Sequence, residues 1–199
     1  MHARQTAAEE RTAFLLYLSV VVLAVVVRNI NLPDRAFFCD VPAQVQAIES
    51  GRFLIQFPGY APYHRLIAFI QCLGTDAFGG MVLFSLFCGI ATVVYVTATA
   101  EVLAGRTAAI VSGTVMAVGP LPVYFSVVGA SYTTDMLYVS GMFFHGIRAI
   151  HRQSAKHFCL TAAWFVFWVL MRPLSAATSA LGLFVIPLIW KSLKYCSLS

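Results

Sequence analysis

Two aspartates, Asp40 and Asp135, have the side-chain type and the sequence setting that best suit chemistry in this 199-residue chain. Asp40 follows the first hydrophobic segment, and Asp135 lies at the start of the fourth. Two carboxylates on one side of a membrane can serve as a general base for an incoming hydroxyl with a second acid beside it, or can bind a divalent cation. Helix capping is the competing interpretation, because aspartate is a preferred N-cap residue whose charge favours a helix N-terminus.

A cation between two hydrophobic segments, Arg172, is the third candidate. Such an arginine either extends its side chain to the lipid headgroups or binds an anionic group such as a lipid phosphate. His64 and Arg65 are adjacent in the segment after the first hydrophobic stretch and could orient a substrate, although a solvated histidine is the ordinary alternative there. No pair of histidines or cysteines has the spacing of metal ligands, and nucleotide-binding and nucleophile-elbow motifs are absent from the sequence.

The composition is that of a membrane protein. Hydrophobic residues make up 60% of the chain, charged residues 11%, and the mean hydropathy is +0.82. A soluble domain carries about 25% charged residues, so this chain has too few charges to cover a water-facing surface. The aromatic content of 14% excludes a disordered chain. A soluble enzyme is therefore excluded, and the net charge of +5 is attributed to cytoplasmic loops and not to nucleic-acid binding.

The gaps between charged residues predict an all-α, polytopic fold of about six transmembrane helices, because a span needs about 20 mostly apolar residues. We expect spans at 12–28, 77–100, 107 to about 119, about 131–150, 158–171 and 173–190. The chain would then form one transmembrane domain, 1–199, with cytoplasmic tails at 1–11 and 191–199 and an outer loop at 29–76. Lys and Arg concentrate on the side of the membrane that holds the two termini, so both termini are expected to be cytoplasmic. The expected location is the plasma membrane or the bacterial inner membrane.

The outer loop is predicted to contain two amphipathic helices that lie in the membrane interface. In the first, Asp40 suits the N-cap, Pro42 suits the first turn, and Ser50-Gly51 ends the helix. Its polar side carries residues such as Gln44. Its apolar stripe consists of Val41, Val45 and Ile48.

The second outer-loop helix is expected to begin at Pro62 and to end at Gly74. Its apolar side is expected to carry Leu66, Phe69, Ile70 and Leu73. A rigid turn that contains Pro58, Gly59 and Tyr60 joins it to the first helix. The loop would thus form a structured cap outside the bilayer.

The order of these features resembles the GT-C superfamily of membrane glycosyltransferases, and most closely its protein O-mannosyltransferase-like members. The resemblance covers roughly residues 13–190 and is one of pattern. It is carried by an anchor helix, an early loop aspartate and a series of short motifs. These motifs are Ala47-Ile48-Glu49-Ser50-Gly51, Phe57-Pro58-Gly59-Tyr60, Leu73-Gly74, Leu103-Ala104-Gly105-Arg106, Gly119-Pro120 and Tyr132-x-x-Asp135.

The resemblance implies transfer of a sugar from a polyprenyl-phosphate donor to an acceptor at the extracytoplasmic face. Asp40 matches the family aspartate that acts at the acceptor, as a base or through a metal, and Asp135 matches a second acid of the same centre. Some branches of the family require a divalent cation, Mg²⁺ or Mn²⁺, which Asp40 and Asp135 would hold. On the donor side, Arg172 matches a basic residue suited to the phosphate. The other donor-side matches are Pro58, Gly59, Tyr60, His64 and Arg65.

Members of this family usually have more spans than this chain, which resembles their N-terminal transmembrane module. Three interpretations follow: a shortened enzyme, an enzyme completed by a partner subunit that supplies further helices, and an inactive six-span scaffold or lipid-binding subunit of a larger membrane complex. A transporter agrees less well with the sequence, because the acidic residues gather at one predicted surface and not within the spans.

Overall fold

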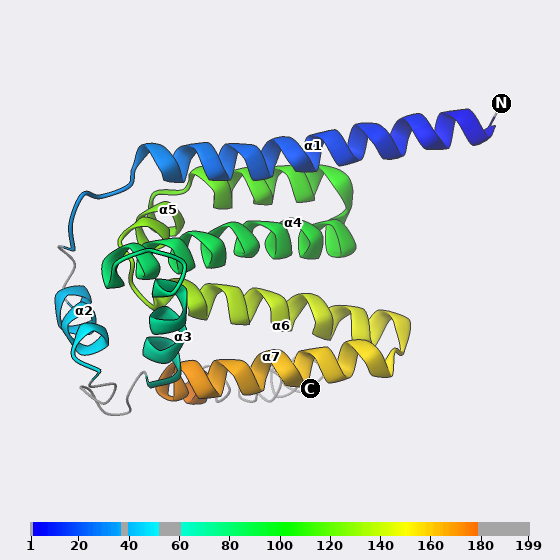
Figure 1. Ribbon diagram of the computed structural model, residues 1–199. Helices are drawn as coiled ribbons and strands as arrows, with labels where there is room; N and C mark the ends of the chain where they lie inside the picture. Colours follow the sequence, from blue (N-terminus) through cyan, green and yellow to red (C-terminus); the bar gives the residue numbers. More distant parts are fainter. Residues whose placement is uncertain (1, 37–39, 52–60, 179–199) are drawn as a thin grey trace, which may run out of the picture.

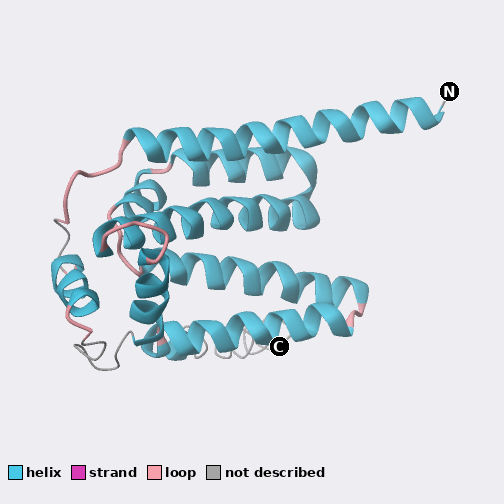
Figure 2. Ribbon diagram, in the orientation of Figure 1, coloured by secondary structure: helices cyan, strands magenta, loops and turns pink. Residues whose placement is uncertain are grey.

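The computed structural model describes residues 2–36, 40–51 and 61–178, and every regular element in these ranges is an α-helix (Figure 2). The all-α prediction is confirmed for this part of the chain. In chain order the helices are α1 (His2–Ile30), α2 (Val41–Glu49), α3 (Ala61–Gln71), α4 (Ala77–Val118), α5 (Pro120–Val127), α6 (Tyr132–Arg152) and α7 (Ala155–Met171). After a break at Arg172, residues 173–178 are helical again.

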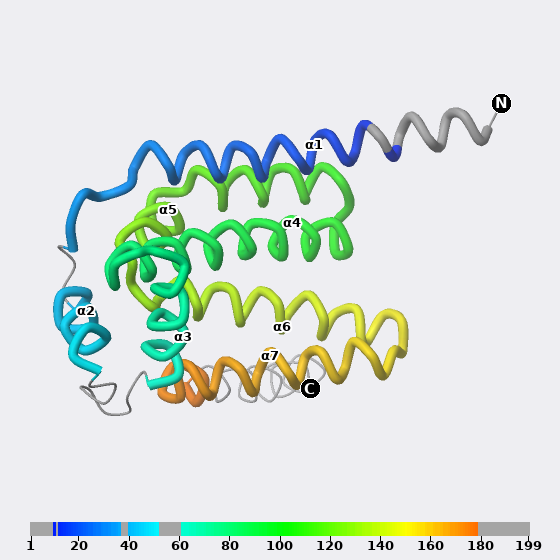
Figure 3. Tube along the Cα trace, viewed as in Figure 1, coloured from blue at the N-terminus to red at the C-terminus, as the bar shows by residue number. Residues whose placement is uncertain are grey.

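The long helices lie side by side in a bundle, and the short ones gather at one end of it (Figure 1). α4 packs against α1, α5 and α6, and α6 packs against α7. We call the end that holds α2, α3, α5 and the start of α6 the cap end. The opposite end, where α4 reverses and α6 connects to α7, is the turn end (Figure 3). This division matters because the candidate site lies at the cap end.

α4 consists of two helical arms that meet at Gly105. This glycine has φ 82° and ψ −175°, a conformation that side-chain-bearing residues rarely adopt. The first arm begins where the sequence predicts, at Ala77, because the carboxylate of Asp76 accepts a hydrogen bond of 2.6 Å from the backbone N–H of Gly79. The second arm ends at Val118, next to Gly119 and Pro120. Gly105 therefore separates the second and third predicted apolar segments, and Gly119-Pro120 ends the third as predicted.

Within the described residues, two helical segments are long and apolar enough to cross a membrane, Thr12–Ile30 and Ala77–Val118. α7 is apolar but has only 17 residues. Most of the last predicted span, 173–190, lies outside the described residues, as does the predicted tail 191–199. The count of six spans therefore stays a prediction.

Both segments expected to form outer-loop helices are helical, as α2 and α3, but their buried faces differ from the expected ones. In α2, Gln44 is buried although it was assigned to the polar side. In α3 the buried residues are Tyr63, His64 and Ile67, whereas Phe69 is 68% exposed. The reason is that α3 packs against α4 through Tyr63 and Ile67, which share a core cluster with Met81. The predicted apolar stripe of α3 thus points away from the bundle core at Phe69.

Gly89, in the first arm of α4, allows three segments to approach one another. A Cβ at this position would collide with the Oγ of Ser126 and would lie 2.7 Å from the Cβ of Ser126 and 3.1 Å from Nε of Arg28. Both neighbours are fully buried. Gly89→Ala should therefore lower the free energy of unfolding by about 1–3 kcal/mol, the usual cost of overpacking. Thermal unfolding of the purified protein in detergent measures this change.

Gly146 in α6 provides the matched control. A Cβ there would have its nearest neighbour 3.8 Å away, at the methyl group of Thr161, which is ordinary contact. Gly146→Ala should leave the stability unchanged or raise it, because alanine favours a helix more than glycine does. Equal losses in the two variants would contradict close packing at Gly89.

Candidate functional site

An ion pair between Asp135 and Arg172 forms the centre of the cap end. Asp135 lies in the first turn of α6, whose N-cap is Ser131. Arg172 follows α7 with φ −145° and ψ 74°, because the residue before Pro173 is disfavoured in the helical conformation. This break turns the guanidinium toward α6, and Arg172 Nε lies 3.0 Å from Asp135 Oδ2. The N-cap role considered for Asp135 is therefore wrong, because Ser131 occupies that position. The extension of Arg172 toward lipid headgroups is also wrong, because its side chain pairs with Asp135.

Four further residues hold the Asp135–Arg172 pair in place. Trp168 Nε1 donates a hydrogen bond of 2.7 Å to the second oxygen of Asp135, Oδ1. Arg172 Nη1 donates to Ser131 Oγ at 2.8 Å, and Arg172 Nε lies 3.3 Å from Ser175 Oγ. The guanidinium also lies over the ring of Tyr132, 4.7 Å from its centroid. Arg172 is only 9% exposed and Trp168 only 1%, so the pair is fixed in a largely dry setting.

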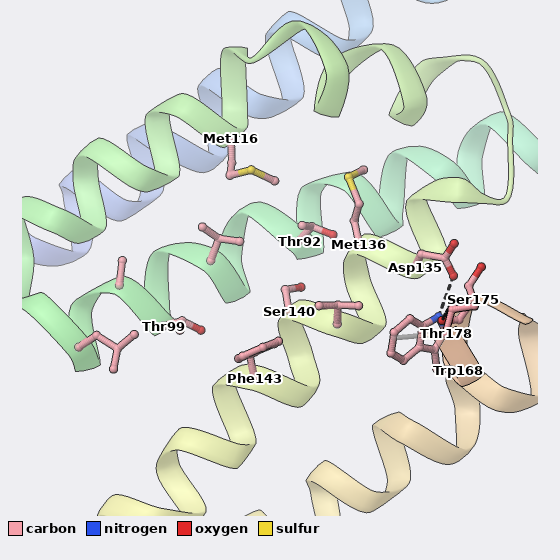
Figure 4. A pocket seen from close by; sticks show the side chains of 14 residues that line it. Thr92, Thr99, Met116, Asp135, Met136, Ser140, Phe143, Trp168, Ser175 and Thr178 are labelled. Carbon is pink, nitrogen blue, oxygen red and sulfur yellow. Dashed lines mark hydrogen bonds between the residues drawn. The ribbon is translucent and has the colours of Figure 1, made fainter. Parts of the chain in front are cut away.

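A groove of about 760 Å³ runs along the bundle from Asp135, the acidic member of this ion pair. Its walls come from both arms of α4, from α6, from Trp168 of α7 and from the helical residues after Arg172. The lining residues are Thr92, Val96, Thr99, Ala100, Leu103, Met116, Asp135, Met136, Val139, Ser140, Phe143, Trp168, Ser175 and Thr178. Figure 4 shows Asp135, Trp168, Ser175 and Thr178 together at one end of this α4–α6 groove. The groove is thus mostly apolar, with its ionic group at the cap end, and its size is that of a ligand site.

Asp40 lies at the same end of the bundle as Asp135 but does not contact it. It directly precedes α2, is half-buried, and makes no capping hydrogen bond with its side chain. Its neighbour Val41 belongs to the same core cluster as Val128 and Ala130, which lie just before α6. In the described part of the chain, no hydrogen bond or ion pair joins the two carboxylates. The two aspartates therefore share an end of the molecule, but they do not form one carboxylate pair in this structure.

The surroundings of Asp135 do not fit Mg²⁺ or Mn²⁺. Its two oxygens already accept from Arg172 Nε and Trp168 Nε1, and a cationic neighbour opposes binding of a second cation. Among the described residues, no group of three or more His, Cys, Asp or Glu side chains could hold a metal ion. We therefore derive no step through a metal.

The donor-side candidates have different settings. His64 is buried in α3 beside Tyr63, so the alternative of a solvated histidine is wrong. Burial also raises the pKa of the neighbouring Tyr63 hydroxyl. Tyr63 donates a hydrogen bond of 3.3 Å to the carbonyl of Gly129. Arg65 is exposed on α3. Pro58, Gly59 and Tyr60 lie outside the described residues.

The sequence interpretation missed the residues that orient the ion pair, above all Trp168, Ser131 and Ser175. One signal for Trp168 was present, because it precedes Arg172 by four residues and so lies one helical turn before it. A second omission is Arg28, which is fully buried and donates to the carbonyl oxygens of Ala117 at 3.0 Å and Met116 at 3.4 Å. It contributes to the bundle and not to the groove.

Comparisons with known proteins find no matching family model, no matching curated protein and no matching solved structure.

Proposed function

We propose that this chain is a membrane glycosyltransferase module of GT-C type, which moves a sugar from a polyprenyl-phosphate donor to an acceptor at the extracytoplasmic face. The observation that carries the proposal is the α4–α6 groove, which is mostly apolar and is lined at the cap end by Asp135, the ion-pair partner of Arg172. A polyprenyl phosphate has the same division, with a long apolar chain and one anionic end. That the sugar passes from the lipid donor to an acceptor at the extracytoplasmic face is inferred from the resemblance of the sequence pattern to the GT-C superfamily.

Placement in a membrane is supported by the exposure of the apolar helices. Only 22% of the apolar window in Thr12–Ile30 is buried, and Phe14 and Val22 are 65% and 51% exposed. A core helix of a soluble protein would be covered by other protein segments. The exposed apolar side chains of α1 can instead be covered by lipid tails. We propose six spans, with both termini in the cytoplasm and with α2 and α3 as interfacial helices over the cap end. Phe69 on the outer side of α3 suits that depth.

In the proposed reaction Arg172 holds the donor phosphate, while Asp135, Ser131 and Trp168 keep the guanidinium in position. The acceptor hydroxyl oxygen bonds to the anomeric carbon as the bond from that carbon to the phosphate oxygen breaks. The hydroxyl proton passes to Asp40, and polyprenyl phosphate is the leaving group. Attack opposite the leaving phosphate inverts the configuration at the anomeric carbon.

Transfer in proteoliposomes from a radiolabelled polyprenyl-phosphate sugar tests this function. Asp40→Asn should lower the rate by on the order of 100-fold to 10,000-fold, the range for loss of a general base. Asp34→Asn, an exposed aspartate of the same loop, is the matched control and should leave the rate unchanged. Turnover by the Asp40→Asn protein at the wild-type rate would remove Asp40 from the mechanism.

A lipid-binding subunit without turnover is the second candidate. It is favoured by the engagement of both Asp135 oxygens by Arg172 and Trp168, without a contact to Asp40. This function predicts binding of polyprenyl phosphate with no transfer, co-purification with a larger membrane complex, and tolerance of Asp40→Asn. Transfer by the wild-type chain alone would exclude it.

A further inference from the structure

The connection between α6 and α7 at the turn end is a short, strongly cationic turn. Gln153 adopts a left-handed conformation with φ 47°, and the backbone N–H groups of Gln153 and Ser154 both bond to the carbonyl of Ala149, which closes the turn. Arg152 and Lys156 flank it and are both exposed. Arg148, one helical turn earlier, lies over the ring of Phe144 at 4.8 Å from its centroid. The turn thus brings three permanent cations together.

No carboxylate of the same segment balances these cations. The sequence contains no Asp or Glu after Asp135, which lies at the opposite end of α6. The pKa of His157 is lowered by burial and by the positive charges of Arg148, Arg152 and Lys156. Such a local excess of positive charge on one turn attracts anions.

The same turn exposes large apolar side chains beside its cations. Ile150 is 72% exposed and Phe158 is 69% exposed. They line a hollow of about 330 Å³ whose other lining residues are Ala149, Gln153, Ser154 and Ala155. An anionic ligand for this surface should therefore carry an apolar part, which an inorganic anion or a nucleotide phosphate lacks.

The length of α6 places the turn at headgroup depth. Its 21 residues span about 32 Å at 1.5 Å per residue, close to the roughly 30 Å of a bilayer hydrocarbon core. If the start of α6 lies at one membrane surface, as the membrane placement of the bundle requires, Arg152 and Lys156 lie among the headgroups of the other. Ile150 and Phe158 can then reach the acyl chains.

We infer that the α6–α7 turn is a binding site for the headgroup of an anionic phospholipid, with the phosphate at Arg152 and Lys156 and the first acyl carbons against Ile150 and Phe158. This inference does not depend on sugar transfer. The site is separate from the α4–α6 groove, since the two share no lining residue and the groove contacts α6 only between Asp135 and Phe143. Its ligand is a lipid of the bilayer, not the proposed donor.

Native mass spectrometry of the delipidated full chain, titrated with phosphatidylglycerol or with phosphatidylcholine of the same acyl chains, tests the site. Wild type should bind phosphatidylglycerol more tightly than phosphatidylcholine. Arg152→Gln/Lys156→Gln should weaken phosphatidylglycerol binding by about 25-fold, since each Lys or Arg near an anionic surface contributes roughly a fivefold factor. Arg152→Lys/Lys156→Arg, which keeps both charges, should bind as wild type does.

The control is Arg35→Gln, which removes one exposed cation near the cap end and should not change the binding. Equal affinity for the two lipids, or unchanged binding in the Arg152→Gln/Lys156→Gln protein, would overturn the inference. Displacement of phosphatidylglycerol by inorganic phosphate at equal concentration would also overturn it, because the site would then be one for soluble anions. Equal melting temperatures of the variants in phosphatidylcholine would show that the folded state is intact.

Discussion

Replacing Arg172 with methionine should lower sugar transfer by on the order of 100-fold to 1000-fold, the usual loss when one charge-stabilising donor is removed from a reaction centre. The reason is that Arg172 is the buried cation paired with Asp135, which lines the cap end of the groove, where the donor phosphate would arrive in the proposed reaction. Arg172→Lys should retain an intermediate rate, because lysine keeps the charge but not the planar fork that contacts Asp135 and Ser131 together. Initial rates in proteoliposomes measure both.

Stability measurements separate this effect from misfolding. Arg172→Met leaves Asp135 with a partly buried, uncompensated charge and should lower the free energy of unfolding by about 2–3 kcal/mol. This loss is no larger than the low end of the roughly 3–5 kcal/mol expected for a broken buried ion pair, because Asp135 is partly exposed. Asp135→Asn/Arg172→Met removes both charges and should recover most of that stability without recovering transfer. A double variant that transfers sugar at the wild-type rate would show that Arg172 has no role in the reaction.

Replacing Arg28 with methionine should lower the free energy of unfolding by about 3 kcal/mol, since each buried carbonyl that loses its donor costs roughly 1–3 kcal/mol. Arg28 joins α1 to the end of α4 across a long sequence separation, through the carbonyl oxygens of Ala117 and Met116. The Met116 carbonyl would otherwise lack a helical donor, because the residue four positions later is Pro120, which has no N–H. Denaturant unfolding in detergent measures the change.

Arg35→Met is the matched control for Arg28, because this arginine is exposed. Its substitution should change the stability by less than about 0.5 kcal/mol. If the Arg28→Met protein proved as stable as wild type or more stable, the cost of burying the guanidinium would outweigh its hydrogen bonds, and Arg28 would not hold α1 to α4.

Most of the helices could be predicted from local signals, because these signals act within a few residues. Asp76 caps α4, and Gly105 permits its reversal. The short helix α5 was not predicted, because Gly119 and Pro120 were interpreted only as the end of a span, although proline also suits the first turn of a helix. The buried face of α3 could not be predicted in the same way. This helix has apolar residues on more than one side, and only packing against α4 selects Tyr63 and Ile67 over Phe69.

The candidate site was predicted in part. Asp135 and Arg172 were each singled out, but their pairing was not, since they lie on different helices and meet only because the chain breaks at Arg172 before Pro173. Trp168 was missed because it lies in the apolar helix α7, where a tryptophan resembles any core residue and only its spacing of four residues from Arg172 indicates a polar role. A joint centre of Asp40 and Asp135 was expected from the sequence; in the structure Asp135 pairs with Arg172 instead.

Photo-crosslinking with a polyprenyl phosphate that carries a diazirine in its chain tests most directly whether the α4–α6 groove binds the lipid donor. After reconstitution and irradiation, mass spectrometry of the digested protein locates the label. If the groove binds the donor, label appears on the walls of the α4–α6 groove, at residues such as Val96, Leu103 and Phe143, and is lost when unlabelled polyprenyl phosphate is added. Label confined to the other apolar hollow of the bundle, beside Phe87 and Leu160, or label that unlabelled lipid does not reduce, would contradict it.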